Sequence, residues 1–229
     1  MSINGRFLAL RLEGPLQSWG FDSQYNRRNT GLMPTKSAIG GICCAALGYN
    51  RGGSEESRFL EEFRGLRMIS IAIPRIVDKK FKDQIKKEVL KVRRLQDYHT
   101  VLNTVTADGN AKPCHITHRG YLSDAMFGVI LEGKPEVLEK IAAGLADPVW
   151  GIWLGRKSCI PTAPVLAGMA TSKEDALRLL KIDALEKYTF QEDAETFAEG
   201  RDSLPDIPVS FASDNRRFSP RRVRMAYAE

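Results

Sequence analysis

The chain has three histidines, His99, His115 and His118, within one short stretch, and Tyr98 directly precedes the first of them. Imidazole exchanges protons near pH 7, so it suits general acid–base catalysis. Tyr98, His99 and Lys36 could deprotonate a 2′-hydroxyl and protonate a leaving oxygen, which is the chemistry of a metal-independent ribonuclease. The same side chains also suit stacking on RNA, hydrogen bonding to it, or packing against the protein. Residue types alone favour binding or packing over catalysis.

The segment CHITH places Cys114 beside two of these histidines, but the rest of a zinc site is missing. A structural zinc ion needs four ligands at suitable spacing, and the chain has no CxxC pair. The motifs GxxxxGK[ST], GxSxG and HExxH are also absent, and no GxGxxG follows a strand pattern. We therefore predict no metal and no cofactor.

The segment IWLGRKSCIP (152–161) contains the end of an apolar run at 149–155. Gly155 ends this run, and three polar residues follow it. Gly155 permits a tight turn and a close approach of the backbone. Arg156, Lys157 and Ser158 then supply two cations and a hydroxyl, which together can bind one phosphate. The alternative is a surface turn that happens to be cationic.

Positive charge is concentrated in two segments. The chain carries a net charge of +6. Residues 75–94 contain nine Lys or Arg against three Asp or Glu, and residues 214–224 contain five Arg against one Asp. Clustered positive charge is typical of proteins that bind a polyanion, although basic runs are also found on ordinary solvated faces.

The remaining composition is that of an ordinary globular protein, with 43% hydrophobic and 27% charged residues. The first residues lack the pattern of a signal peptide, and no apolar run approaches the roughly 20 residues of a membrane span. We therefore expect a cytoplasmic protein with no membrane partner. Its four cysteines are then expected to be reduced thiols.

Hydrophobic periodicity predicts strands at 6–13, 66–74, 125–133 and 149–155. Helices are predicted from a cap at Thr35 to Gly48, from a cap at Ser54 to Gly65, and at 135–146. This order predicts an α+β fold with a ferredoxin-like (RRM-like) palm over 1–161. A long basic insertion at about 75–124, here called the thumb, separates the second and third strands. Residues 162–229 form a small C-terminal subdomain with a helix at 171–180, capped by Ser172, and a basic tail.

A long polar segment follows the first predicted strand and contains Gln17, Trp19, Arg27 and Arg28. Long segments of this kind within a compact domain are often functional. Trp19 could offer a stacking surface to a base, although a lone tryptophan more often belongs to the core.

Four stretches of the chain carry a family resemblance: LRLEGPLQSWG (10–20), PTKSAIGGICCAALG (34–48), RLQDYHTVLN (94–103) and LGRKSCIPTAPV (154–165). Together and in this order they resemble the CasD family, the fifth-class Cas subunit of the type I-E CRISPR Cascade complex. The stretch RGYLSDAMFGVIL (119–131) also fits, whereas the C-terminal third matches only loosely.

The resemblance implies a non-catalytic subunit that grips the 5′ handle of CRISPR RNA (crRNA). It further implies that the subunit caps one end of the filament of backbone subunits (CasC) and meets the large subunit (CasA). Residue chemistry at the matching motifs predicts RNA contacts by Gln17, Trp19, Arg27, Arg28, Lys36, Ser37, Tyr98, His99, Arg119, Arg156, Lys157 and Ser158. Lys36 and Ser37 would bind phosphate at the start of a helix.

Two points stay open at this stage. Related subunits of the type I-C branch are metal-independent endoribonucleases that process precursor crRNA, and Tyr98, His99 and Lys36 would suit that role. The Lys-rich stretch 79–91 and the Arg-rich stretch 216–224 exceed the charge expected of the family. Either stretch could contact RNA, target DNA or an acidic face of a partner.

Overall fold

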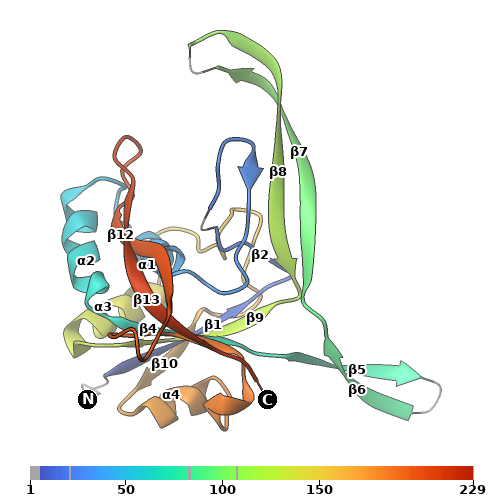
Figure 1. The fold of residues 1–229 in the computed structure, drawn as a ribbon, viewed down its shortest axis with the longest axis vertical. Helices are drawn as coiled ribbons and strands as arrows, with labels where there is room; N and C mark the ends of the chain where they lie inside the picture. The colour runs from blue at the N-terminus through green and yellow to red at the C-terminus, as the bar shows by residue number, and fades with distance from the viewer. Residues whose placement is uncertain (1–5, 21, 82–83, 107, 229) are drawn as a thin grey trace.

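A computed structural model describes residues 6–20, 22–81, 84–106 and 108–228 of the chain. Its main body is a seven-stranded sheet in which every strand is antiparallel to its neighbours (Figure 1). In spatial order the strands are β10 (Leu166–Ala170), β1 (Phe7–Glu13), β9 (Met126–Glu132), β4 (Arg67–Ala72), β11 (Phe190–Asp193), β13 (Arg217–Ala226) and β12 (Asp202–Ser210).

Three of the four predicted palm strands are confirmed as β1, β4 and β9, but the strand predicted at 149–155 is wrong. The backbone amides of Val149 and Trp150 donate to carbonyls of Ala46 and Ala45, at the end of a helix, rather than to a strand. Gly155 has a φ of +103°, which lies outside the β region. The edge position beside β1 is taken instead by β10.

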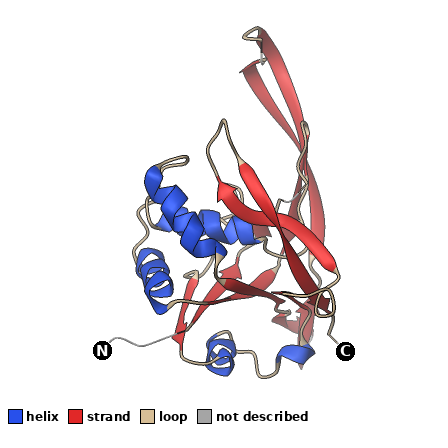
Figure 2. Cartoon of the chain, turned by 60° about the vertical axis from the view of Figure 1, so that its left-hand side comes forward, coloured by secondary structure: helices blue, strands red, loops and turns tan. Residues whose placement is uncertain are grey.

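Helices cover both faces of the sheet (Figures 1 and 2). On one face lie α1 (Lys36–Ala46), α2 (Ser54–Arg64) and α3 (Pro135–Ala146), which pack Ile39, Phe59 and Leu138 into one core with residues of β1, β4 and β9. On the other face lies α4 (Lys173–Leu179), whose Leu177 belongs to a second core, and the short 3₁₀ helix η1 (Leu185–Lys187) follows it.

Two of the three helix N-caps predicted from the sequence are confirmed, and one is wrong. The Thr35 hydroxyl accepts a hydrogen bond from the amide of Ala38, and the Ser172 hydroxyl accepts one from Asp175, as predicted. The predicted cap at Ser54 is wrong, because Gly53 occupies the cap position and Ser54 is the first helical residue.

The insertion between β4 and β9 consists of two hairpins that project from the body (Figure 1). The shorter hairpin pairs β5 (Arg75–Phe81) with β6 (Gln84–Leu90), and the longer one pairs β7 (Arg93–Val105) with β8 (Ala111–Ser123). The short strands β2 (Leu16–Gln17) and β3 (Arg27–Arg28) both pair with β8. The polar segment after β1 is therefore attached to the base of the long hairpin.

The stretch 162–229 contributes strands to both ends of the seven-stranded sheet, with β10 beside β1 and with β11, β13 and β12 beyond β4. The domain boundary near residue 161 stays a prediction. Within the described part of the chain, no helix combines the length and the apolar character needed to cross a membrane.

Gly155 is predicted to be essential for stability. A Cβ atom added there would lie 1.8 Å from the carbonyl oxygen of Ser18, in addition to the unfavourable φ. We expect Gly155→Ala to lower the free energy of unfolding by about 3 kcal/mol or more, measured by denaturant unfolding.

Gly109→Ala is the matched control, because Gly109 also has a positive φ, of +81°, yet no atom of the described residues lies within 4 Å of an added Cβ. It should cost only about 1–2 kcal/mol. Equal destabilisation of the two variants would contradict the close approach at Gly155.

Candidate nucleic-acid interface

Cations gather at the base of the long hairpin because β3 pairs with β8 there. Arg27 lies opposite His118 and Arg28 opposite Arg119, and the amide of His118 donates to the carbonyl of Asn26 at 2.8 Å. The side chains of Arg27 and Arg28 are exposed, and that of Arg119 is half-buried. The pairing thus brings together cations that the sequence separates widely, as an RNA-binding surface requires.

The turn formed by residues 155–158 packs against this base. The Arg156 guanidinium donates to the carbonyl oxygens of Gly120 at 2.7 Å and Arg28 at 2.6 Å, and it lies 4.6 Å from the centre of the Tyr121 ring. Arg156 therefore holds β3, β8 and the turn together. This differs from the predicted free phosphate ligand, whereas Lys157 and Ser158 are exposed at the outer side of the turn.

Tyr98 and His99 lie on β7 with their side chains on opposite faces of the hairpin, since successive strand residues alternate. Tyr98 is 61% exposed and packs edge-on against the His118 ring, with 5.4 Å between ring centres. The Nδ1 atom of His99 lies 3.5 Å from a carboxylate oxygen of Asp97. On the same face, Arg119 donates to the hydroxyl of Thr117 at 3.1 Å. A single ligand group therefore does not meet Tyr98 and His99 together.

Gln17 and Trp19 are fully buried, which differs from the surface position that direct RNA contact requires. The Gln17 amide donates to the carbonyl oxygens of Leu12 at 3.0 Å and Ala125 at 2.7 Å. The Trp19 ring packs edge-on against Phe127, with ring centres 6.4 Å apart. Between them, the two side chains therefore contact residues of β1 and the start of β9 in the interior of the protein.

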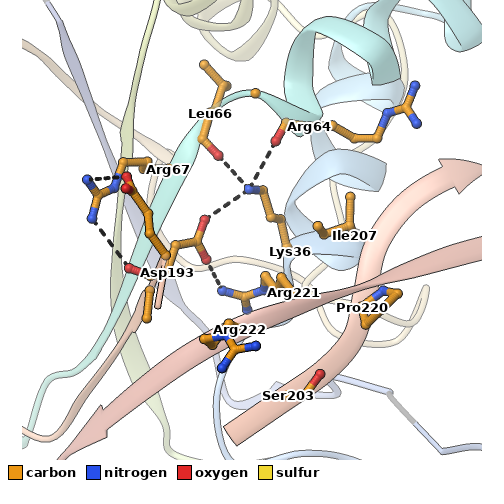
Figure 3. A pocket seen from close by; sticks show the side chains of 13 residues that line it. Lys36, Arg64, Leu66, Arg67, Asp193, Ser203, Ile207, Pro220, Arg221 and Arg222 are labelled. Carbon is orange, nitrogen blue, oxygen red and sulfur yellow. Dashed lines mark hydrogen bonds and ion pairs between the residues drawn. The ribbon is translucent and has the colours of Figure 1, made fainter. Parts of the chain in front are cut away.

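Lys36 and Ser37 stand at the predicted start of α1, but acidic residues of the chain itself occupy this helix end. The amide of Lys36 donates to Asp206 at 2.8 Å. The Lys36 ammonium, nearly inaccessible to solvent, reaches Asp193 at 3.0 Å and the carbonyl oxygens of Leu66 and Arg64 (Figure 3). Burial lowers the pKa of Lys36, while Asp193 opposes that shift. The Ser37 hydroxyl lies 3.2 Å from that of Thr35.

Arg221 completes this buried group of charges. Its guanidinium forms two hydrogen bonds to Asp206, at 2.6 and 2.9 Å, and also contacts Asp193. We call Lys36, Asp193, Asp206 and Arg221 the buried ion-pair network. Three of its members, Lys36, Asp193 and Arg221, line a pocket of about 450 Å³ together with residues of α2, β12 and β13 (Figure 3). Sequence reasoning missed the two aspartates, whose only signal was the acidic character of residues 174–206.

The structure does not bring Lys36 together with Tyr98 and His99. The contacts of Lys36 come from α2, the residues just before β4, and β11, whereas those of His99 come from β7 and β8. Among the described residues, no three His, Cys, Asp or Glu side chains form a group that could hold a metal ion.

Comparison with known proteins first defines the class. The structure resembles a chain of a solved "CRISPR RNA-guided surveillance complex" with a TM-score of 0.74 and 28% identity, covering 97% of this chain and 90% of that one. A "Crystal structure of Cas protein" gives a TM-score of 0.64 at 28% identity, covering 96% of this chain and 93% of that one. The fold is thus that of a CRISPR-associated protein.

The family follows from the sequence. The family described as "CRISPR-associated protein (Cas_Cas5)" matches residues 7–224, and the chain belongs to it. "CRISPR system Cascade subunit CasD" of Escherichia coli (strain K12) is 29% identical over 218 residues, which cover 90% of this chain and 92% of that protein. The resemblance to CasD expected from the four motifs is confirmed.

Removing the Arg221 guanidinium should destabilise the packing of the C-terminal strands against α1. Arg221→Met leaves Asp206 buried without its main partner, so we expect a decrease of about 3–5 kcal/mol in the free energy of unfolding. Denaturant unfolding followed by circular dichroism measures it.

The control is Arg224→Met on the same strand, because Arg224 pairs with Glu192 but its side chain is 52% exposed. That pair should contribute only about 0–1 kcal/mol. Equal stability of the Arg221 variant and the wild type would show that the network does not hold these strands.

Proposed function

We propose that the chain is a non-catalytic crRNA-binding subunit of a type I-E-like Cascade complex and that it grips the 5′ handle of the crRNA. Membership of the Cas5 family and the similarity to CasD support this role. The observation that carries the proposal is the exposure of Arg27, Arg28 and Lys157 around the base of a projecting hairpin. These cations come from two distant parts of the chain. Their backbones are held by β3, β8 and the turn at 155–158, while their side chains are exposed to solvent.

The chemistry of these residues suits single-stranded RNA. Guanidinium groups bind phosphate oxygens through paired hydrogen bonds, and an exposed aromatic ring can stack on a base of any sequence. Arg27 and Arg28 would hold phosphates, Lys157 and Ser158 would add contacts from the turn, and Tyr98 would stack. By the strand register, Arg27 and Tyr98 would act on one hairpin face, and Arg28, Arg119 and His99 on the other. Arg156 supports the hairpin base from within, whereas Gln17, Trp19, Lys36 and Ser37 would act only indirectly, by holding the fold.

We further propose that the palm is ferredoxin-like. The strand order β10-β1-β9-β4, with α1 and α2 between β1 and β4 in sequence and α3 between β9 and β10, supports this. The aromatic residues on these four strands are Phe7 and Phe127, and both pack into the cores. A sheet-based RNA-binding surface uses exposed aromatic rings, so here the loops and the hairpin would do the binding.

The long hairpin also suits an assembly role. Its outer half carries exposed apolar side chains, among them Leu102 and Val105 at 67% and 68% exposure. Apolar residues that project in this way commonly become covered by a partner. We propose that the hairpin inserts between the RNA and the last backbone subunit, CasC, that the chain caps the filament there, and that it also meets the large subunit, CasA. A contact between the chain and target DNA belongs to the same proposal.

The absence of catalysis is part of this proposal. A ribonuclease site built from Tyr98, His99 and Lys36 would need all three at one phosphate. Tyr98 and His99 instead point to opposite faces, and Lys36 is buried in ion pairs. Endonucleolytic processing of precursor crRNA, as in the type I-C branch, is the alternative that the following experiment separates.

The test incubates the full chain with end-labelled CRISPR repeat RNA in EDTA and compares native with denaturing gels. We expect a shift on the native gel and intact RNA on the denaturing gel. A cut at the 5′ edge of the handle that disappears in His99→Ala would contradict the proposal and make the chain the processing nuclease.

A paired variant tests the contact surface. Arg27→Ala combined with Lys157→Ala should weaken handle binding about tenfold, the scale expected when charge-assisted hydrogen bonds are removed. Arg178→Ala combined with Lys187→Ala removes the same charge from α4 and η1, on the other face of the sheet, and should leave binding unchanged. If both double variants weaken RNA binding equally, binding depends on the net charge of the chain and not on the position of Arg27 and Lys157.

A further inference from the structure

The Arg-rich stretch 216–224 divides into three arginines that pair or stack within the chain and two, Arg216 and Arg217, that form no ion pair in the described part of the chain. Arg221 belongs to the buried ion-pair network, Arg224 pairs with Glu192, and Arg222 stacks on Phe197 at 3.3 Å. Arg216, in the loop between β12 and β13, is exposed, and no ion pair joins it to a carboxylate of the described chain. Its guanidinium lies 5.3 Å from the Phe218 ring and 6.0 Å from the Phe211 ring, which restrict its position.

A buried carboxylate holds this loop against the loop between α1 and α2. Glu56 is fully buried. One of its carboxylate oxygens accepts hydrogen bonds from the backbone amides of Gly52 at 2.9 Å and Phe211 at 3.3 Å. The contact is close, since a Cβ added at Gly52 would lie 3.0 Å from the Cβ of Ala212. The fold therefore fixes Arg51 and Arg216 on two loops that pack together.

A third cation, Arg28 of the hairpin base, acts electrostatically on Arg216. Desolvation together with the positive charges of Arg51 and Arg28 lowers the pKa of the Arg216 guanidinium. Arg28 and Arg51 are exposed as well, and neither forms an ion pair within the described chain. The positive charges of Arg28 and Arg51 thus oppose that of Arg216, at a place where no carboxylate of the described chain forms an ion pair with any of the three guanidinium groups.

We propose that Arg28, Arg51 and Arg216, the arginine cluster, bind a backbone phosphate of the crRNA. A phosphate would relieve the repulsion and offer acceptors that match the planar guanidinium groups. RNA is the occupant that we favour, because Arg28 belongs to the hairpin base that we propose to hold RNA, and Arg51 and Arg216 are exposed on two loops that pack together. This inference rests on the proposed function and extends the interface from the hairpin base to the loops at 47–53 and 211–216.

The test measures the binding of 5′-labelled handle RNA to the full chain by fluorescence anisotropy at several salt concentrations. Arg51→Ala combined with Arg216→Ala should weaken binding about tenfold. It should also reduce the slope of log affinity against log salt by about 0.7 for each phosphate that the variant no longer neutralises. The pair Arg178→Ala and Lys187→Ala, which removes equal charge, should change neither quantity, and equal unfolding midpoints establish that all variants are folded.

The outcomes separate the two proposals. A wild-type chain that does not bind handle RNA would overturn the proposed function and this inference with it. Wild-type binding that the Arg51 and Arg216 variant retains in full would overturn only the inference. Unchanged RNA affinity with weakened binding of single-stranded DNA would also overturn it, because the cluster would then serve DNA.

Discussion

The buried ion-pair network is the constraint on which much of the molecule depends. Lys36 lies at the start of the first helix, whereas Asp193, Asp206 and Arg221 lie on the last three strands. Taking four charges out of water is costly unless each finds a partner, and here two cations face two carboxylates with good hydrogen-bond geometry. The C-terminal strands must therefore dock on α1 in one position.

That docking has consequences at the surface. Once β12 and β13 are fixed against α1, their connecting loop packs on the loop between α1 and α2, where Glu56 ties the two together. At the base of the long hairpin, Arg156 fixes β3 to β8 through two backbone carbonyls. In both places a charged side chain that bonds to the backbone, Glu56 or Arg156, fixes the segments that carry exposed cations. The proposed RNA interface is thus a set of exposed cations on segments that buried or half-buried charged side chains hold in place.

The sequence predicted the parts of this structure that follow from local patterns. Alternating apolar residues located β1, β4 and β9, and Thr35 and Ser172 marked two helix starts. The strand predicted at 149–155 failed because this segment does not pair in a sheet. Its amides bond to the end of α1, an interaction that no period in the sequence reveals.

The candidate site divides in the same way. Arg27, Arg28, Lys157 and Tyr98 are exposed, so the RNA contacts predicted for them stay a prediction that the fold allows. The roles of Gln17, Lys36 and Arg156 could not be predicted, because residue type does not tell whether a polar side chain faces a ligand or a distant group of its own chain. Asp193 and Asp206 are separated from Lys36 by more than half of the sequence, so only the fold could reveal their pairing.

Hydrogen exchange of the chain with and without handle RNA tests the central claim most directly, because it locates the interface without any substitution. Our account predicts that RNA slows amide exchange in β3, at the base of β7 and β8, and in the turn at 155–158. Bound RNA that leaves these segments unchanged and protects only other surfaces would contradict it.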